Sequence, residues 1–312
     1  MKRAGRLAPL VLAALGAVAA GASAEVRVLP VTSIEDGLLA PTSLCVSTDQ
    51  IAVLEPFASR LLVYTADGRL TRRVDFSGDA SGLVRWSARE YASCDRDAGA
   101  VFAIGLDEGS EPRPLTPAGA LADPIDLLPV AGGFGVLDAG AAEVVSLDAS
   151  GSITGRRPLL DASGARLGYP VSMDRFAGEW FVFDQSDSRI HVYAEDGAHV
   201  RSFCSFGAGA ATVTRGGCLR VDSRGLVYVT DRFQGRVAVF RTDGSFLGHL
   251  DPAASAGRRL NIPMGLGLDA GGLLYVASAE ARRIDLFQVD ADDLRALPTA
   301  IAVGPLGDAV RP

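Results

Sequence analysis

The sequence predicts an all-β fold, a six-bladed β-propeller, and two repeated markers carry that prediction. The first marker is the residue that closes the second apolar run of each repeat: Glu55, Asp138, Asp184, Asp231 and Ser278. Its spacings are 83, 46, 47 and 47 residues, and the first of these spans two repeats. The second marker is a turn glycine with the same register, at Gly68, Gly151, Gly197 and Gly244. One period in two markers indicates an array of like units, because a single unit cannot bury its own apolar face.

Each repeat contains three or four short apolar runs that are typical of strands. The runs at 51–54, 180–183 and 273–276 are rich in aliphatic, β-branched and aromatic residues, and Gly, Asp and Ser separate such runs. Asp-Gly pairs at 67–68, 196–197 and 243–244 favour hairpin turns between strands. Four antiparallel strands in each radial unit would form one propeller blade.

The second repeat is the least regular of the six. It falls between the markers Glu55 and Asp138, and no third acid with the same spacing is evident there. We place its marker strand at 100–104, an apolar run that does not end in an acid.

The two ends of the array suggest how the ring closes. The last repeat, 262–289, shows three clear strands, whereas the run 26–31 is a strand without a repeat of its own. Because an open ring would leave unpaired strand edges, we expect this first strand to pair as the outer strand of the last blade. The propeller is thus predicted over 25–290, and residues 291–312, which contain three prolines, are expected to form a C-terminal tail.

Residues 1–24 have the pattern of a cleavable signal peptide. Lys2, Arg3 and Arg6 precede an apolar stretch over 7–20, and Ala-Ser-Ala at 22–24 resembles a cleavage site. The alternative, a membrane anchor, is less favoured because the apolar stretch is too short to span a bilayer comfortably. We therefore expect a periplasmic or secreted protein, with no transmembrane segment in the mature chain.

The charge of the chain argues against nucleic acid as a partner. Removal of 1–24 would leave 27 basic and 37 acidic residues, a net charge of −10. Binding to a phosphate backbone requires a positive field, which this balance does not supply. Arg is nearly the only cation available, since Lys2 is the one lysine.

The repeats resemble a known propeller family. The run 261–269, followed by 272–276 and 283–287, is similar to an NHL repeat, and 169–197 and 219–244 show the same resemblance. In bacteria this resemblance implies a propeller that contacts another protein, sometimes within envelope redox assemblies. Some NHL domains bind RNA on one face, but the acidic balance of this chain argues against that role.

Four cysteines in an exported chain favour disulfides. Cys204 and Cys218 are 14 residues apart around a loop rich in Gly and Ala, and we expect them to pair. A loop of this size would contribute about 3 kcal/mol. Cys45 and Cys94 occupy nearly matching places in neighbouring repeats, where either a disulfide or two buried thiols would fit.

The central channel is the first place to look for a metal site. The register of the repeats places five residues near it: Glu90, Asp126, Ser172, Arg220 and Asn261. Propellers of the gluconolactonase type hold calcium there with Glu, Asn and Asp, so Glu90, Asp126 and Asn261 are candidate calcium ligands. His191, His199 and His249 lie in or near third and fourth strands, too far apart to share one zinc ion.

The loops after the marker acids are the candidate surface for a partner. Each acid is followed about five residues later by a charged residue, in three of four cases Arg, which is typical of a braced loop. Phe57 and Phe233 lie two residues past their acids, either packed on the neighbouring blade or offered to a partner. The candidates for partner binding are Phe57, Arg60, Arg189, Arg232, Phe233, Arg236 and Arg283.

These patterns favour a non-enzymatic exported propeller that binds another cell-envelope protein. No catalytic residue and no cofactor is assigned under this hypothesis. The alternative is a calcium-dependent lactonase or esterase-like hydrolase with its site at the central channel. A purely structural module is the third possibility.

Overall fold

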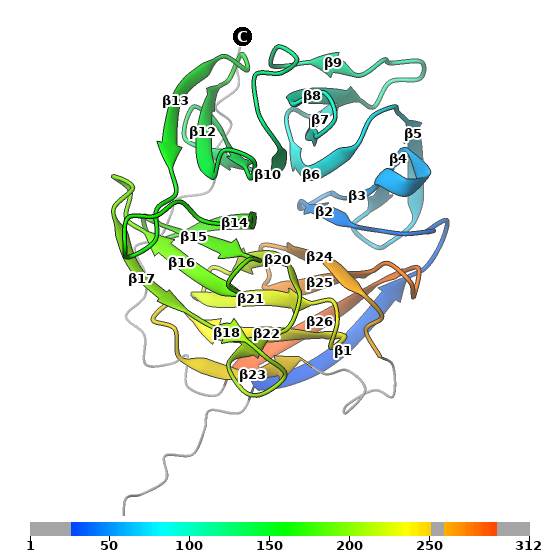
Figure 1. Ribbon diagram of the computed structural model, residues 1–312. Helices are drawn as coiled ribbons and strands as arrows, with labels where there is room; N and C mark the ends of the chain where they lie inside the picture. Colours follow the sequence, from blue (N-terminus) through cyan, green and yellow to red (C-terminus); the bar gives the residue numbers. More distant parts are fainter. Residues whose placement is uncertain (1–25, 251–258, 292–312) are drawn as a thin grey trace, which may run out of the picture.

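The computed structural model describes residues 26–250 and 259–291, and its strands form six four-stranded sheets around a common centre (Figure 1). This confirms the predicted all-β fold with six blades. Apart from the strands, the described residues contain one short 3-10 helix, η1 (Pro56–Ala58). The predicted signal peptide over 1–24 lies outside the described residues, and so does the expected tail except for Ala291.

Each blade is an antiparallel sheet whose first strand lies nearest the centre. Blades 1 and 2 contain β2 (Ser43–Val46), β3 (Gln50–Glu55), β4 (Arg60–Thr65), β5 (Leu70–Asp75), β6 (Ala80–Arg85), β7 (Glu90–Asp95), β8 (Ala100–Gly105) and β9 (Arg113–Pro114). Blades 3 and 4 contain β10 (Pro124–Val130), β11 (Gly133–Asp138), β12 (Glu143–Asp148), β13 (Ile153–Pro158), β14 (Pro170–Phe176), β15 (Glu179–Asp184), β16 (Arg189–Tyr193) and β17 (His199–Phe203). Blades 5 and 6 contain β20 (Gly216–Val221), β21 (Leu226–Asp231), β22 (Arg236–Arg241), β23 (Phe246–Leu250), β24 (Pro263–Leu268), β25 (Leu273–Ser278), β26 (Arg283–Ala291) and β1 (Val26–Ile34). The link between blades 4 and 5 adds a parallel pair, β18 (Ser205–Phe206) and β19 (Thr212–Val213).

The apolar core is divided among the interfaces between blades. The described residues form six clusters, and each cluster draws its main members from two adjacent blades. Tyr64 of blade 1, for example, packs with Tyr275 of blade 6, and both are almost fully buried. The array therefore gains its stability from stacking of neighbours, as the repeat predicts.

The ring closes through the first strand of the chain. Strand β1 pairs antiparallel with β26, from Val26 opposite Ala291 to Ile34 opposite Ile284 (Figure 1). This confirms the predicted closure, and β1 extends three residues beyond the expected run, to Ile34. The pairing covers the edge of β26 that would otherwise lie open.

The marker residues have the expected places in five blades. Strands β3, β11, β15, β21 and β25 end at Glu55, Asp138, Asp184, Asp231 and Ser278. The turn glycines join third to fourth strands with positive φ, for example +86° at Gly68 and +94° at Gly244, a conformation that glycine adopts without strain.

The second blade differs from the prediction. Its second strand is β7, which ends at Asp95, and the run at 100–104 belongs to β8, the third strand. Asp95 is thus the missing marker, and its carboxylate accepts a hydrogen bond from the Ala98 amide at 3.0 Å. Blade 2 is shorter than the later blades, since its marker follows Glu55 by only 40 residues.

No helix among the described residues has the length and apolar character that a membrane span requires.

Candidate functional site

The mouth of the central channel is a cavity of about 450 Å³ on one face of the ring. We call this face the loop face. It consists of the loops between second and third strands and of the segments that link one blade to the next. All six blades line the cavity, through residues that include Ser43, Ser81, Asp126, Ser172, Cys218 and Met264. The last four of these are each 46 residues apart, so the repeat itself sets the rim of the cavity.

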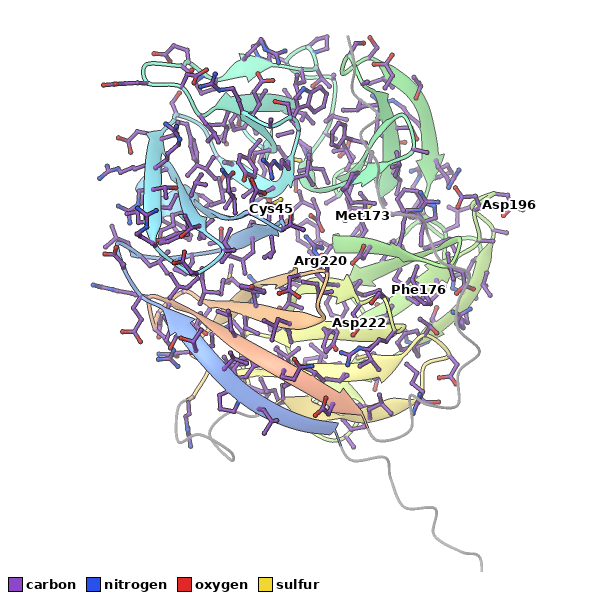
Figure 2. The ribbon with its side chains drawn as sticks, turned by 180° about the vertical axis from the view of Figure 1, so that it is seen from behind. Cys45, Met173, Phe176, Asp196, Arg220 and Asp222 are labelled. Carbon is purple, nitrogen blue, oxygen red and sulfur yellow. The ribbon has the colours of Figure 1, made fainter. Side chains whose placement is uncertain are left out.

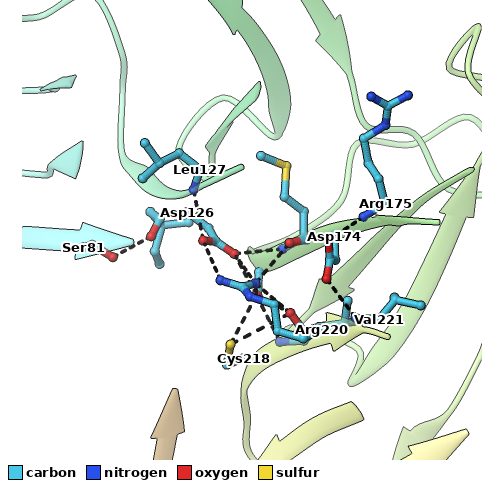
Figure 3. Close-up of polar contacts among 12 residues, drawn as sticks. Ser81, Asp126, Leu127, Asp174, Arg175, Cys218, Arg220 and Val221 are labelled. Atoms are coloured by element: carbon cyan, nitrogen blue, oxygen red, sulfur yellow. Dashed lines mark hydrogen bonds and ion pairs between the residues drawn. The ribbon is translucent and has the colours of Figure 1, made fainter. Parts of the chain in front are cut away.

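A network of polar contacts crosses the channel among the residues that line this cavity. The Arg220 guanidinium on β20 donates to Asp126 on β10, at 3.1 Å to Oδ2 and 3.3 Å to Oδ1 (Figure 3). Ser172 on β14 donates to Asp126 Oδ2 at 2.8 Å, which joins blades 3, 4 and 5. Figure 2 shows Arg220, Met173 and Cys45 near the centre of the ring, with Asp196 at its periphery.

The electrostatics of this network follow from burial. Burial alone would lower the pKa of Arg220, but the nearby acidic groups, Asp126 first, raise it above its ordinary value. Burial also raises the pKa of Asp174, one blade away, although the charge of Arg220 opposes the shift. The Asp174 carboxylate accepts hydrogen bonds from the amides of Val221 at 2.8 Å and Arg175 at 2.7 Å. The positive charge of Arg220 and the negative charge of Asp126 thus balance each other inside the channel.

The candidate calcium ligands do not converge. Asp126 faces the channel mouth, Glu90 lines a different cavity, and Asn261 lines a third. Glu90 lies at the start of β7, a second strand, and forms an ion pair with Arg113 at 3.0 Å. Asn261 is exposed ahead of β24. The prediction that Glu90 lies near the channel is wrong, because it places the marker of blade 2 on the third strand instead of the second.

One group of side chains in the described part of the chain has the spacing of metal ligands. Asp184, Asp187 and His191 bring their ligand atoms within 4.8 Å of one another, and none of the three lines the channel-mouth cavity. Asp184 is already occupied, since it accepts hydrogen bonds from the amides of Gly168 at 2.7 Å and Tyr169 at 2.9 Å. His191 contacts Asp187 at 3.1 Å. These contacts account for the cluster as part of the loop brace.

The marker acids fix the links between blades, as their pattern predicts. Asp138 accepts hydrogen bonds from the amides of Ala122 and Asp123, both at 2.8 Å, and is fully buried. Asp231 accepts from four backbone amides: Thr214, Arg215, Phe233 and Gln234. Each carboxylate thereby holds the segment that precedes the first strand of its own blade.

The arginines that follow the acids have different roles. Arg60 is buried and pairs with Glu55 at 2.5 Å, so its side chain is not offered on the surface. Arg236 is 3.9 Å from Asp231, and Arg283 pairs with Asp285 at 2.8 Å. Arg189 is exposed and forms no ion pair with any residue that the structure describes. Of these four candidates, Arg189 is the one whose charge is free for a partner.

The aromatic candidates point outward. Phe57 is 86% exposed and Phe233 is 73% exposed, rather than packed on the neighbouring blade. Phe206, which is not among the predicted candidates, is 71% exposed in the link between blades 4 and 5. All three lie on the loop face, because they belong to its loops and links. The three side chains therefore offer apolar surface to a partner on the same face of the ring.

The four cysteines are free thiols, and the predicted pairing of Cys204 with Cys218 is not formed. Cys204 follows the outermost strand of blade 4, whereas Cys218 lies on β20, the innermost strand of blade 5. The link between them runs from the rim of the ring to its centre, which separates the two sulfur atoms. Cys94 lies on the second strand β7 and Cys45 on the first strand β2, so their places do not match either. Burial raises the pKa of Cys45 to about 11.

Comparisons with known proteins support the fold. The sequence matches no protein-family model and no curated protein. Among solved structures, a gluconolactonase from Xanthomonas campestris is similar over 85% of this chain and 90% of its own, with a TM-score of 0.63 and 17% identity. Virginiamycin B lyase from Staphylococcus aureus is similar over 85% of this chain and 99% of its own, with a TM-score of 0.58 and 12% identity. At these identities the likeness defines the class of this chain, a six-bladed β-propeller, and no activity.

Proposed function

We propose that this chain is an exported, non-enzymatic propeller that binds another protein of the cell envelope through its loop face. The resemblance of its repeats to bacterial NHL proteins is consistent with this role. The observation that carries the proposal is the exposure of Phe57, Phe206 and Phe233 on the loop face. Aromatic side chains of this kind are frequent at the centres of protein interfaces.

The arrangement of the channel supports a binding role over metal-dependent hydrolysis. A calcium site requires several oxygen ligands around one point. Here Asp126 is held by Arg220 and Ser172, and the guanidinium lies where a cation would have to approach. Glu90 and Asn261 lie in other cavities, so the residues present do not fit a calcium ion held by this set.

The test of the proposal is site-specific photo-crosslinking in the native envelope. A photoreactive amino acid replaces Phe57 in one variant and Phe233 in another. The matched control places it at Ala270, which is exposed in the turn between the first and second strands of blade 6, on the opposite face. We expect the two loop-face positions to give the same adduct and the Ala270 position to give none. Equal labelling from all three positions, or no adduct from the loop face, would overturn the proposal.

The fold likeness to a gluconolactonase favours calcium-dependent hydrolysis of lactones as the second candidate function. Under it, the purified protein would hydrolyse lactones with calcium, and a chelator would abolish turnover. A thermal shift of several degrees on adding calcium, reversed by the chelator, would favour this function over partner binding.

A further inference from the structure

Two arginines at the channel mouth differ from the others around them. Arg215 and Arg232 both line the 450 Å³ cavity, and neither forms an ion pair with any residue that the structure describes. The other two arginines of the cavity are neutralised. Arg220 pairs with Asp126 at 3.1 Å, and Arg96 pairs with Asp123 at 2.8 Å. Arg is nearly the only cation in this chain, so the presence of arginines alone does not indicate a binding site. The absence of an acidic partner at Arg215 and Arg232, within the described part of the chain, is the more specific sign.

Arg232 is held in place without an acidic group. Its Nη2 donates to the Gly216 carbonyl at 3.2 Å, and its Nη1 is 3.9 Å from the Met264 sulfur. Its buried Nε has no hydrogen-bond partner. A buried donor without a partner costs free energy, which a bound acceptor would recover.

The backbone fixes Arg215 and Arg232 relative to each other. The Arg232 amide donates to the Arg215 carbonyl at 2.9 Å, and the Asp231 carboxylate accepts from the Arg215 amide at 3.2 Å. Burial lowers the pKa of Arg232, and the positive charge of Arg215 lowers it further. The fold thus holds two like charges at one cavity, an arrangement that an anion would stabilise.

The charge of the cavity has the opposite sign to that of the chain. Four arginines and two aspartates line it, whereas the whole sequence has a net charge of −7. Apolar side chains also line the cavity, among them the half-buried Ile125 and Met264. The volume is within the usual range for sites that bind small molecules, about 300–1,000 Å³.

We propose that the channel mouth binds a small organic oxyanion, a carboxylate or phosphate group on an apolar body, with the anion between Arg215 and Arg232. The planar guanidinium groups offer paired N–H donors that suit both oxyanions. The apolar part of the ligand would lie toward Ile125 and Met264, which line the cavity and are only half-buried. This proposal goes beyond partner binding on the loop face and does not depend on it.

The test is calorimetric titration of the purified protein with benzoate and with phenyl phosphate, and benzamide serves as the neutral control. We expect at least one of the two anions to bind with a Kd of about 1 mM or tighter, more weakly as salt is added, and benzamide not to bind. The tighter of the two anions identifies the favoured oxyanion. Neither probe requires a protein partner, so this result is independent of the crosslinking result.

Three variants assign the binding to the arginine pair. Arg232→Gln and Arg215→Gln should each weaken binding about tenfold or more, because each removes charge-assisted hydrogen bonds. Arg189→Gln is the matched control, since it removes the same charge from the loop face outside the cavity, and binding should not change. The exposed Arg215 tolerates substitution even if Arg232→Gln folds poorly. No binding of either anion at about 10 mM, or equal binding in all variants, would overturn the proposal.

Discussion

Asp126 and Arg220 are 94 residues apart in the sequence and meet across the channel, with Oδ2 and Nη1 separated by 3.1 Å. The two side chains come from blades 3 and 5, and Ser172 of blade 4 donates to the same carboxylate. The pair thus ties three blades together at the centre of the ring. Its position also explains why the channel presents a neutralised acid rather than a free one.

Asp126→Ala should leave the Arg220 charge unpaired in a largely buried site. We expect the free energy of unfolding to fall by about 3–5 kcal/mol, measured by urea denaturation. Arg220→Met in the same background should recover part of the loss. The control is Arg89→Gln at the exposed pair with Asp107, where the change should stay below about 1 kcal/mol. A similarly small loss in Asp126→Ala would show that the pair does not stabilise the ring.

Asp138→Ala should destabilise the protein through its backbone contacts alone. The carboxylate accepts three amide hydrogen bonds, from Ala122, Asp123 and Ala141, in a fully buried site, and their loss should cost about 1–3 kcal/mol for each buried amide left unpaired. Ser278 occupies the same place in blade 6, and its buried hydroxyl has no hydrogen-bond partner. Ser278→Ala should therefore be neutral within about 0.5 kcal/mol or stabilising. Equal losses in the two variants, in thermal or urea unfolding, would contradict this role of the marker acids.

The closing strand provides a matched pair of substitutions. Ile34 is 5% exposed and packs between blades 1 and 6, whereas Val31 on the same strand is 55% exposed. Ile34→Ala should lower the free energy of unfolding by about 2–5 kcal/mol. Val31→Ala should change it by less than about 0.5 kcal/mol. If both variants unfold at the wild-type urea concentration, β1 does not contribute to the stability of the ring.

A thiol titration checks the state of the cysteines. The denatured, unreduced protein should contain four reactive thiols, because all four cysteines are free. In the folded protein, Cys94 and Cys218 should react slowly, since burial raises the pKa of both thiols and restricts access. A count of only two thiols after denaturation would show that one disulfide is present and would support the predicted pair.

Stability should fall as the pH falls through the range in which His199 titrates. Burial, and then the neighbouring His191, lower the pKa of His199 below its ordinary value of 6.5. The folded state therefore binds this proton less readily than the unfolded state, and acid favours unfolding. Between about pH 8 and about pH 5, His199→Gln should lose less stability than the wild type. Parallel curves of unfolding free energy against pH would exclude this contribution.

Much of the fold could be predicted because its markers are local. A buried acid at the end of a second strand and a glycine in a turn are encoded within a few residues, as at Asp138 and Gly151. The marker of blade 2 was not predicted, because Asp95 is followed by Arg96 and Asp97 and the three charged residues together resemble a solvated loop. The predicted disulfide failed for a different reason, since distance along the chain does not show that a link crosses from rim to centre.

The candidate site was harder to predict than the fold. Arg232 was selected from its place after Asp231, but Arg215 and the contact between Asp126 and Arg220 were not. Contacts across the channel depend on the radius of the ring and on the rotation of each inner strand, which spacing alone does not give. One signal was present in the sequence, the step of 46 residues that relates Asp126 to Ser172 and Asp174 to Arg220.

The union of β1 with β26 also has a kinetic consequence. Val26 and its partner Ala291 are among the most widely separated residues that the structure describes, so this union is a contact of very high sequence separation. Contacts of that kind form slowly, because a long stretch of chain must be ordered before they stabilise anything. During synthesis β1 has to stay unpaired until the strands of blade 6 have been made. We therefore expect the last and slowest event in folding to be the joining of the two ends, with sheet-edge aggregation as its competitor.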